Sequence, residues 1–413
     1  MNLNLPDEFV RPSYHGRSIA NIPATIAHLL DAPFSGLPRL EGELWQPIAE
    51  GITRVVVILL DAMGWNLYHQ ERSCFQEMLG ETAVSAQITS VFPATTVAAL
   101  STLWTGFAPA QHGLLGFRLF LPDYAAVGQM ITFTPAFGNY TGILVKSGLD
   151  PETFLPVPGI AQQLQTTSVP TYSFKEQHLV KTPLSDMHGR GVKQEHGAVS
   201  FAHMLVQLRQ LLEAQAGQKL YAFAYWPTID TLSHYHNWQS AAVAAECRAL
   251  IHQIRQELFV PLSAAARAGT ALFITADHGQ IACPLEQQVR LADHPELEQM
   301  LLMQPAGDTR AVYLYAKHGR QADILTYVRE NLFHAFAAVP TAVALSSGLF
   351  GPQPHAPTAS ERTGDVVLLA RKGTALLNKL DDSRTRQFLG WHGSLEADEM
   401  IVPWLGYRLD RPS

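Results

Sequence analysis

The sequence predicts an α/β protein built on a mainly parallel sheet. Short apolar runs rich in β-branched and aromatic residues recur along the chain, and long helical stretches separate them. Several of these runs, such as residues 54–60, are apolar throughout. Such runs are typical of strands that are buried on both faces, which is the usual situation in a parallel sheet covered by helices.

Expected strands and helices alternate along most of the chain. We expect strands at residues 54–60, 141–145, 171–174, 220–226, 271–275, 311–315 and 365–370. We expect helices at residues 22–30, 96–105, 197–216, 239–268, 296–302 and 321–333. Only a short C-terminal segment follows the last strand-forming stretch.

Residues 284–378 carry a small strand and helix set of their own, and proline and glycine cluster within them at 348–357. We therefore expect residues 1–283 and 379–413 to form a catalytic core, with 284–378 as a smaller α/β subdomain inserted into it. No repeat or low-complexity tract interrupts the pattern.

The composition excludes several classes of protein. Hydrophobic residues make up 47% of the 413-residue chain and charged residues only 16%, which excludes a disordered chain. The formal charge of -7 is spread without long single-sign blocks, so we expect no nucleic acid polymer as a partner. The longest apolar runs have only strand length, which predicts no membrane span. Three widely spaced cysteines and an N-terminal segment without an apolar signal region favour a cytoplasmic protein.

Polar residues directly after the apolar runs are the candidates for chemistry, because ligands bind at the carboxyl ends of strands in open α/β sheets. Asp61 follows residues 54–60, and Asp277 and His278 follow residues 271–275. Asp230 and His234 come after residues 220–226, and their spacing of four lets both point the same way from one helical turn. Each signal alone has an ordinary alternative, such as a helix-capping aspartate or a surface histidine.

Two further places offer polar groups. Pro93 breaks the chain before Thr95 and Thr96, which puts a hydroxyl at a helix N-terminus, where free N–H groups and the helix dipole favour an anion. The alternative is that one of these threonines is only an N-cap. His392 precedes Gly393 in a loop before a helix that contains Glu399, which we expect behind the ligands or at the surface.

Together the carboxylates and imidazoles suffice for two divalent ions, and the cysteines are not needed. The full set is Asp61, Thr95 or Thr96, Asp230, His234, Asp277, His278 and His392.

In its motifs the chain resembles the alkaline phosphatase superfamily, and within it the type I phosphodiesterase and nucleotide pyrophosphatase branch. The motifs run in order from Asp61 to Met400: a strand ending in Asp, a threonine nine residues before Thr105-Gly106, P-x-x-H-G, D-x-x-x-H, D-H-G, and H-G with a downstream E-M. The resemblance implies an alkaline-phosphatase-like three-layer core with a mainly parallel sheet and a smaller inserted α/β subdomain.

The resemblance also implies roles for individual residues. It makes Thr96 the nucleophile of a two-step hydrolysis through a phospho-threonine. It implies two metal ions, zinc with manganese as the alternative, and a small phosphate ester such as a nucleotide as substrate. The implied ligands are Asp61, Thr96, Asp277 and His278 for one ion, and Asp230, His234 and His392 for the other.

Two alternatives remain beside the phosphodiesterase: a phosphomonoesterase of the same superfamily and a catalytically decayed metal-binding protein. Ala99, three residues after Thr96, offers no polar donor, so we expect the backbone N–H of Thr96 or Val97 to bind a phosphoryl oxygen. Because the sequence places no arginine beside Thr96, we expect diesters to be preferred over monoesters. Arg310, His355 and Arg362 are candidates for reading the substrate, with surface or core-facing roles as the alternative. The sequence does not predict the oligomeric state.

Overall fold

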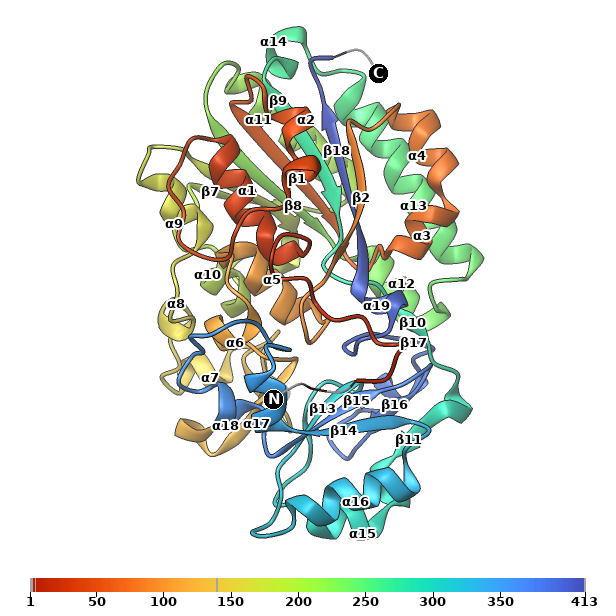
Figure 1. Ribbon diagram of the computed structural model, residues 1–413. Coiled ribbons are helices and arrows are strands. Elements are labelled where there is room, and N and C mark those ends of the chain that lie inside the picture. The colour runs from red at the N-terminus through yellow and green to blue at the C-terminus, as the bar shows by residue number, and fades with distance from the viewer. Residues whose placement is uncertain (1–2, 4, 139, 412–413) are drawn as a thin grey trace.

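The computed structural model describes residues 3, 5–138 and 140–411, and its two seven-stranded sheets lie one above the other in Figure 1. The larger sheet has the strand order β2-β18-β9-β1-β8-β6-β7. Its strands are β1 (Arg54–Leu60), β2 (Val84–Thr89), β6 (Thr171–Glu176), β7 (Gln194–Ala198), β8 (Leu220–Trp226), β9 (Thr270–Thr275) and β18 (Ile401–Arg408). β1, β6, β7, β8 and β9 run parallel, whereas β18 is antiparallel to both of its neighbours.

Helices cover this sheet on both faces (Figure 1). The helices α1 (Ile22–Leu29), α5 (Thr96–Thr105) and α9 (Ile160–Gln165) contact one another on one side. On the other side, α13 (Ala241–Gln253) contacts both α4 (Arg72–Leu79) and α11 (Phe201–Ala214). The expected three-layer core with a mainly parallel sheet is therefore confirmed.

The smaller sheet has the order β14-β15-β13-β12-β3-β4-β5. Its strands are β3 (Arg118–Leu121), β4 (Ala126–Gln129), β5 (Thr134–Pro135), β12 (Ala306–Gly307), β13 (Ala311–Leu314), β14 (Phe336–Pro340) and β15 (Val366–Ala370). Only four of these strands come from residues 284–378. The other three come from 118–135 and join through the pairing of Gly307 with Arg118. The boundaries of the inserted subdomain stay a prediction, but the sheet itself is assembled from two segments.

Short elements complete the chain. Two-stranded ladders join β10 (Ile281–Ala282) to β17 (Gly390–Trp391), and β11 (Gln288–Arg290) to β16 (Ala375–Leu377). The remaining α-helices are α2 (Gln46–Ala49), α3 (Trp65–Gln70), α6 (Pro109–His112), α7 (Ile143–Lys146), α8 (Pro151–Phe154), α10 (Pro183–His188), α12 (Thr228–His236), α14 (Ala264–Arg267), α15 (Pro295–Met300), α16 (Gln321–Asn331), α17 (Thr341–Ser346), α18 (Ala359–Arg362) and α19 (Ala397–Met400). In the part of the chain that the structure describes, no helix is both long and apolar enough to cross a membrane.

Three sequence expectations about elements were wrong. Residues 141–145 hold helix α7 and no strand, because Gly142 adopts a φ of 77° and starts a helical turn. The expected helix at 239–268 is split into α13, a π-helical segment at Ile254–Phe259 and α14, with Pro261 in the break. The C-terminal segment forms β18 inside the larger sheet, although Pro403 and Gly406 both disfavour a strand in the sequence.

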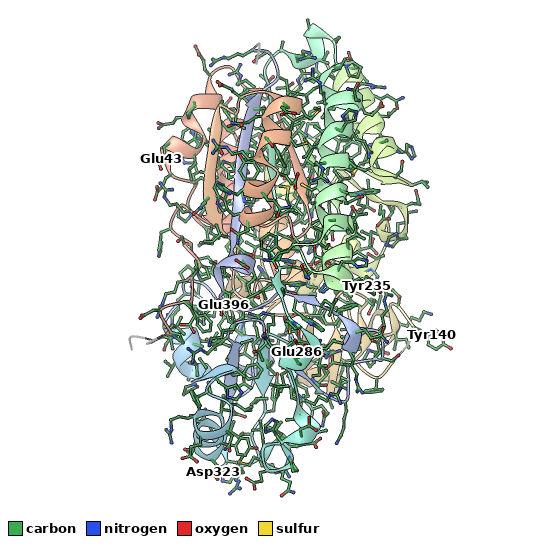
Figure 2. The ribbon with its side chains drawn as sticks, turned by 90° about the vertical axis from the view of Figure 1, so that its right-hand side faces the viewer. Glu43, Tyr140, Tyr235, Glu286, Asp323 and Glu396 are labelled. Carbon is green, nitrogen blue, oxygen red and sulfur yellow. The ribbon has the colours of Figure 1, made fainter. Side chains whose placement is uncertain are left out.

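The side view in Figure 2 shows how the two sheets meet. Glu43 lies on the part built around the larger sheet, whereas Asp323 lies at the far end of the smaller part. Tyr235 and Glu396 lie between them, at the level where the two parts join. The carboxyl ends of β1, β8 and β9 point toward this junction, and they carry the candidate site.

Candidate active site

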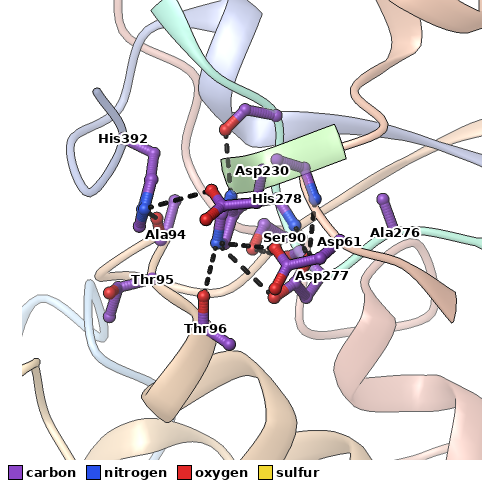
Figure 3. Close-up of polar contacts among 12 residues, drawn as sticks. Asp61, Ser90, Ala94, Thr95, Thr96, Asp230, Ala276, Asp277, His278 and His392 are labelled. Atoms are coloured by element: carbon purple, nitrogen blue, oxygen red, sulfur yellow. Dashed lines mark hydrogen bonds and ion pairs between the residues drawn. The ribbon is translucent and has the colours of Figure 1, made fainter. Parts of the chain in front are cut away.

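Seven polar residues from separate segments converge at the junction, and Figure 3 shows six of them, all except His234. Asp61 follows β1, Asp277 and His278 follow β9, and the register that pairs Leu59 with Thr275 sets these strand ends level. Thr96 is the first residue of α5, and His392 follows β17. Asp230 and His234 stand on α12, which begins directly after β8.

Asp230, His234 and His392 form one potential metal-binding group, in which the ligand atoms lie within 4.8 Å of one another. The Nε2 atom of His234 is 3.4 Å from Asp230 Oδ2, and that of His392 is 3.7 Å from Asp230 Oδ1. The Nδ1 atoms face backbone oxygens, of Gly390 at 2.8 Å and of Ala94 at 2.9 Å. When Nδ1–H donates to these carbonyls, both Nε2 lone pairs are free for a cation.

His278 is the centre of a second group. Its Nε2 atom lies 3.1 Å from Thr96 Oγ1, 3.4 Å from Asp277 Oδ2 and 3.6 Å from Asp61 Oδ1. Ligand atoms of Asp61, Asp230 and His278 also lie within 4.8 Å of one another, so these three residues could share an ion. Asp230 therefore belongs to both groups and lies between them.

The second group fits a metal ion because two of its carboxylate oxygens lack other partners. Asp61 Oδ1 and Asp277 Oδ2 are buried and have no hydrogen-bond partner among the described residues. A buried, unpaired carboxylate oxygen is strongly destabilising, and buried charges are normally paired or bound to metals. A divalent cation at this position would remove that penalty for both oxygens.

The pKa values in the site reflect the same crowding of charge. Burial, followed by the neighbouring Asp277 and Asp230, raises the pKa of Asp61 well above its ordinary value. Burial also raises the pKa of Asp277, although His278 opposes this. Burial, followed by His278, lowers the pKa of His392 well below that of a free histidine. The histidines lower the pKa of Asp230 despite its burial, but the protein alone does not balance Asp61 and Asp277, and cations would favour the ionised form of these two carboxylates.

The two adjacent threonines face different partners. Thr96 Oγ1 points to His278, whereas Thr95 Oγ1 donates to Asp308 Oδ1 at 3.0 Å. The Thr95 side chain does not cap α5, so among the described residues the first N–H groups of this ten-residue helix have no N-cap side chain as acceptor. Ala99 is fully buried in the core of the larger sheet. A phosphoryl oxygen near Thr96 would therefore meet backbone donors and not a side chain at position 99.

Comparison with known proteins decides the family. A model of the family described as Type I phosphodiesterase / nucleotide pyrophosphatase matches residues 55–395. The chain belongs to this family. Membership makes the protein a hydrolase of phosphoric esters, and dependence on metal is typical of the family.

Solved structures with the same fold are distant in sequence. Murine ectonucleotide pyrophosphatase/phosphodiesterase 5 superposes with a TM-score of 0.64 at 18% identity, covering 86% of this chain and 87% of that one. The human protein gives 0.62 at 17%, with the same coverage. Phosphonoacetate hydrolase from Sinorhizobium meliloti 1021, in complex with phosphonoformate, gives 0.60 at 16%, covering 85% and 89%. The search of curated proteins gave no match.

In this phosphodiesterase-family protein, the sequence did not predict several residues that contact the expected ligands. Tyr225 donates from its hydroxyl to Asp61 Oδ2, and Gln280 Nε2 donates to Asp230 Oδ1 at 2.6 Å. Tyr225 lies one residue before the end of β8, and Gln280 comes directly after the D-H-G motif. Their polar side chains, so close in sequence to the expected ligands, could have indicated that both belong to the site.

Two charged residues of the smaller sheet also line the cavity of about 200 Å³ beside Thr96. Arg118 forms an ion pair of 2.8 Å with Asp381. Asp308 accepts hydrogen bonds from Thr95 and from the Phe117 N–H, while burial raises its pKa to about 6. Sequence spacing alone did not indicate that an arginine shares a cavity with Thr96, because Arg118 reaches it only through the pairing of β3 with β12.

The three candidates for reading the substrate have other contacts. Arg310 is fully buried and forms an ion pair with Glu399. The Arg362 guanidinium lies 4.4 Å from the centre of the Phe154 ring and donates to the Gly113 carbonyl. His355 Nε2 is 3.2 Å from the Gly351 carbonyl oxygen. These contacts within the protein agree with the alternative to substrate recognition, namely that these side chains form pairs that face the core.

The histidine of the P-x-x-H-G motif has a structural position. His112 is buried, with Nε2 3.0 Å from Thr102 Oγ1, while its Nδ1 accepts from the Leu114 N–H. Burial lowers the pKa of His112 to about 3, so this ring is neutral. Through its hydrogen bond with Thr102, it links the following loop to α5, the helix that begins with Thr96.

Proposed function

We propose that the protein is a two-metal phosphodiesterase of the nucleotide pyrophosphatase type that uses Thr96 as its nucleophile. One observation carries the proposal: the Thr96 hydroxyl faces His278 within a convergent set of carboxylates and imidazoles, whereas Thr95 is engaged by Asp308. The intact set also argues against a decayed metal-binding protein.

The metal ligands are part of the same proposal. Asp61, Thr96, Asp277 and His278 would hold one divalent ion, and Asp230, His234 and His392 the other. Mixed imidazole and carboxylate ligands suit zinc, with manganese as the alternative. Such ions supply Lewis-acid stabilisation of negative charge on the phosphoryl and leaving oxygens.

The residues of the chain would act in two displacements. In the first, Thr96 Oγ1 forms a bond to phosphorus while the bond to the leaving oxygen breaks, which produces a phospho-threonine and an alcohol. The N-terminal N–H groups of α5 bind a nonbridging phosphoryl oxygen throughout. In the second, a water oxygen bonds to phosphorus and Thr96 leaves. Two in-line displacements give retention of configuration at phosphorus.

The substrate class is proposed as a small phosphodiester, with nucleotides included. An inactive variant of the murine phosphodiesterase 5 has been solved in complex with AMP. A phosphomonoesterase is the second candidate, and Arg118 in the cavity favours it. However, Asp381 neutralises Arg118, and Asp308 adds negative charge, so the dianion of a monoester gains no net cationic partner. For localisation we propose the cytoplasm, because the three cysteines are unpaired, which suits a reducing compartment.

The test uses the purified protein with bis(p-nitrophenyl) phosphate. We expect metal-dependent release of p-nitrophenol and, after acid quenching, a phosphorylated peptide that contains Thr96. The Thr96→Ala variant should show neither signal. Turnover without any phosphorylated threonine, or full turnover after exhaustive chelation, would contradict the proposal.

A further inference from the structure

Gln280 is a buried amide that has no part in the two proposed displacements. It lies between the D-H-G motif and β10, and its exposed fraction is only 1%. Its amide nitrogen donates two hydrogen bonds to one residue: Nε2 lies 2.6 Å from Asp230 Oδ1 and 3.1 Å from the Asp230 carbonyl oxygen. Since both partner atoms are acceptors, the nitrogen of the amide must face them, and not the oxygen.

These two bonds fix the orientation of the Asp230 carboxylate. One bond holds the side chain and the other holds the backbone of the same residue. The carboxylate cannot rotate without breaking a hydrogen bond to an ionised group, which is stronger than a neutral one. With Oδ1 held by Gln280, Oδ2 faces His234 Nε2 at 3.4 Å. Gln280 therefore sets which carboxylate oxygen is directed to a cation beside His234.

Gln280 also contacts the backbone that orients His234. The Gly390 carbonyl oxygen lies 2.8 Å from His234 Nδ1, and the Leu389 N–H donates to the His234 carbonyl at 2.7 Å. A Cβ atom at Gly390 would lie 2.5 Å from Gln280 Oε1, so the amide packs directly against this backbone. The same short segment thus contacts both the amide and the imidazole.

His392 is connected to Gln280 through the two-stranded ladder of β10 and β17. The ladder pairs Ile281 with Trp391, and this antiparallel register, continued by one residue, places Gln280 opposite His392. It joins the segment after the D-H-G motif to the segment before the late H-G motif. Gln280 therefore adjoins the segments of all three residues that are proposed to hold one ion.

One atom of Gln280 lowers the stability of the fold. Oε1 is buried and has no hydrogen-bond partner among the described residues. A buried acceptor without a donor costs free energy of folding, and an apolar side chain of the same length would avoid that cost. Such a side chain would, however, leave Asp230 Oδ1 without its amide donor. The amide therefore favours the orientation of a metal ligand at a cost in stability.

We propose that Gln280 is a positioning residue that sets the affinity for the ion that Asp230 holds with two histidines (the Asp230 ion), and that the affinity for the other ion does not depend on it. Gln280 holds the Asp230 carboxylate in one orientation before the cation binds, which lowers the cost of ordering the site. The proposal rests on the two-metal site proposed above. Gln280 controls the occupancy of one ion and takes no part in the chemical step.

The test titrates the metal-free protein with Zn²⁺ in competition with a chromophoric chelator, which resolves the two binding steps without substrate. Gln280→Met keeps the length of the side chain and removes the donor. We expect it to weaken one step by about 10- to 100-fold, the usual effect of losing a hydrogen bond to a metal ligand. The other step should stay within about twofold. Gln280→Asn, whose shorter amide does not reach Oδ1, should give the same result and serves as the second variant if Gln280→Met does not fold.

His234→Ala identifies the affected step. This variant loses the Asp230 ion, so a single zinc-binding step should remain. Adding Gln280→Met to His234→Ala should leave that remaining step within about twofold of its value. A general loosening of the junction would weaken the remaining step too, because Gln280 lies only two residues after His278. Such weakening, or unchanged zinc affinity in Gln280→Met alone, would overturn the proposal.

Gln207→Met is the matched control. Gln207 stands on α11, where its Nε2 donates to the Gly197 carbonyl at 3.1 Å and its Oε1 is buried without a partner among the described residues. It belongs to neither metal group. Both zinc-binding steps should therefore keep their affinity in this variant. A loss in Gln207→Met as large as that in Gln280→Met would also overturn the proposal.

Zinc binding separates this proposal from the proposed function. A loss of zinc affinity that requires an intact His234 supports the positioning role even if the protein hydrolyses no diester. Where bis(p-nitrophenyl) phosphate is hydrolysed, the zinc concentration for half-maximal turnover should rise in Gln280→Met by the same factor as the dissociation constant. Diester hydrolysis with a zinc affinity that is independent of Gln280 overturns the positioning role and leaves the phosphodiesterase intact.

Discussion

Arg310 and Glu399 form a fully buried bidentate ion pair that links the smaller sheet to two loops of the candidate site. Arg310 Nε and Nη2 donate to the Glu399 carboxylate at 2.9 and 2.7 Å. The same carboxylate accepts from the Ser394 N–H, and the Glu399 carbonyl accepts from the Gly279 N–H. Gly279 directly follows His278 and Ser394 lies two residues after His392, so the pair holds the backbone beside both imidazoles.

The first prediction follows from that pair. Glu399→Gln leaves Arg310 buried without its counter-charge, which should lower the free energy of unfolding by about 3–5 kcal/mol. The positions of His278 and His392 should loosen as well, so bound metal should fall. Urea unfolding and metal analysis measure the two effects. Asp323→Asn, in the half-exposed pair with Arg320, is the control and should change stability by less than about 1 kcal/mol.

The second prediction concerns the two threonines. Thr96→Ala should lose at least about 4 kcal/mol of transition-state stabilisation, roughly a thousandfold in kcat, because it removes the nucleophile. Thr96→Ser should keep part of the rate. Thr95→Val should remain active, since its hydroxyl faces Asp308. Steady-state kinetics on one diester checks this, and an inactive Thr95→Val beside an active Thr96→Ala would reverse the assignment.

The third prediction concerns metal stoichiometry. His392→Ala should reduce bound metal from two ions to one per chain and abolish nearly all turnover, while circular dichroism shows an intact fold. The control is His236→Ala, which changes an exposed histidine on the same helix as His234 but outside the cluster. Metal analysis after gel filtration provides the counts. Two ions retained in His392→Ala would exclude His392 as a ligand.

Strong periodicity made parts of this architecture predictable from the sequence. The uninterrupted apolar run before Asp61 and the helix after Thr95 have the expected bounds. Strand β18 was not predicted, because Pro403 and Gly406 are residues that disfavour a strand. Its pairing with β2 and β9 in the larger sheet stabilises it. Arg118 and Asp308 were missed for a related reason: they reach Thr96 through long-range pairing of β3 with β12, which no local pattern records.

The fourth prediction uses the raised pKa of Asp308, about 6, whose main cause is burial. Between pH 4 and 6 the unfolded chain releases this proton while the folded protein keeps it, so the contribution of Asp308 to stability falls as pH rises, by up to about 3 kcal/mol. Asp308→Asn cannot titrate. Its stability relative to the unmodified protein should therefore improve from pH 5 to pH 7.5 in urea unfolding, and a constant difference would show that Asp308 has an ordinary pKa.

The last prediction is a preference for diesters over monoesters. The sequence places no arginine next to Thr96, which was one reason to expect this preference. In the structure, however, Arg118 lines the same cavity as Thr96, so that reason no longer holds. Its charge is compensated by Asp381 at 2.8 Å, and the half-buried Asp308 carboxylate contributes a further negative charge. A monoester dianion is repelled more strongly by this wall than a diester monoanion.

Two measurements test the preference and its cause. We expect kcat/KM at pH 8 and fixed metal concentration to be higher for bis(p-nitrophenyl) phosphate than for p-nitrophenyl phosphate. Asp308→Asn should narrow this ratio by about tenfold, the equivalent of roughly 1.4 kcal/mol, because it removes the negative charge and keeps the side-chain shape. A monoester preference in the unmodified protein would indicate a phosphomonoesterase. An unchanged ratio in Asp308→Asn would show that the preference arises elsewhere, since Asp308 is the carboxylate that adjoins Thr95.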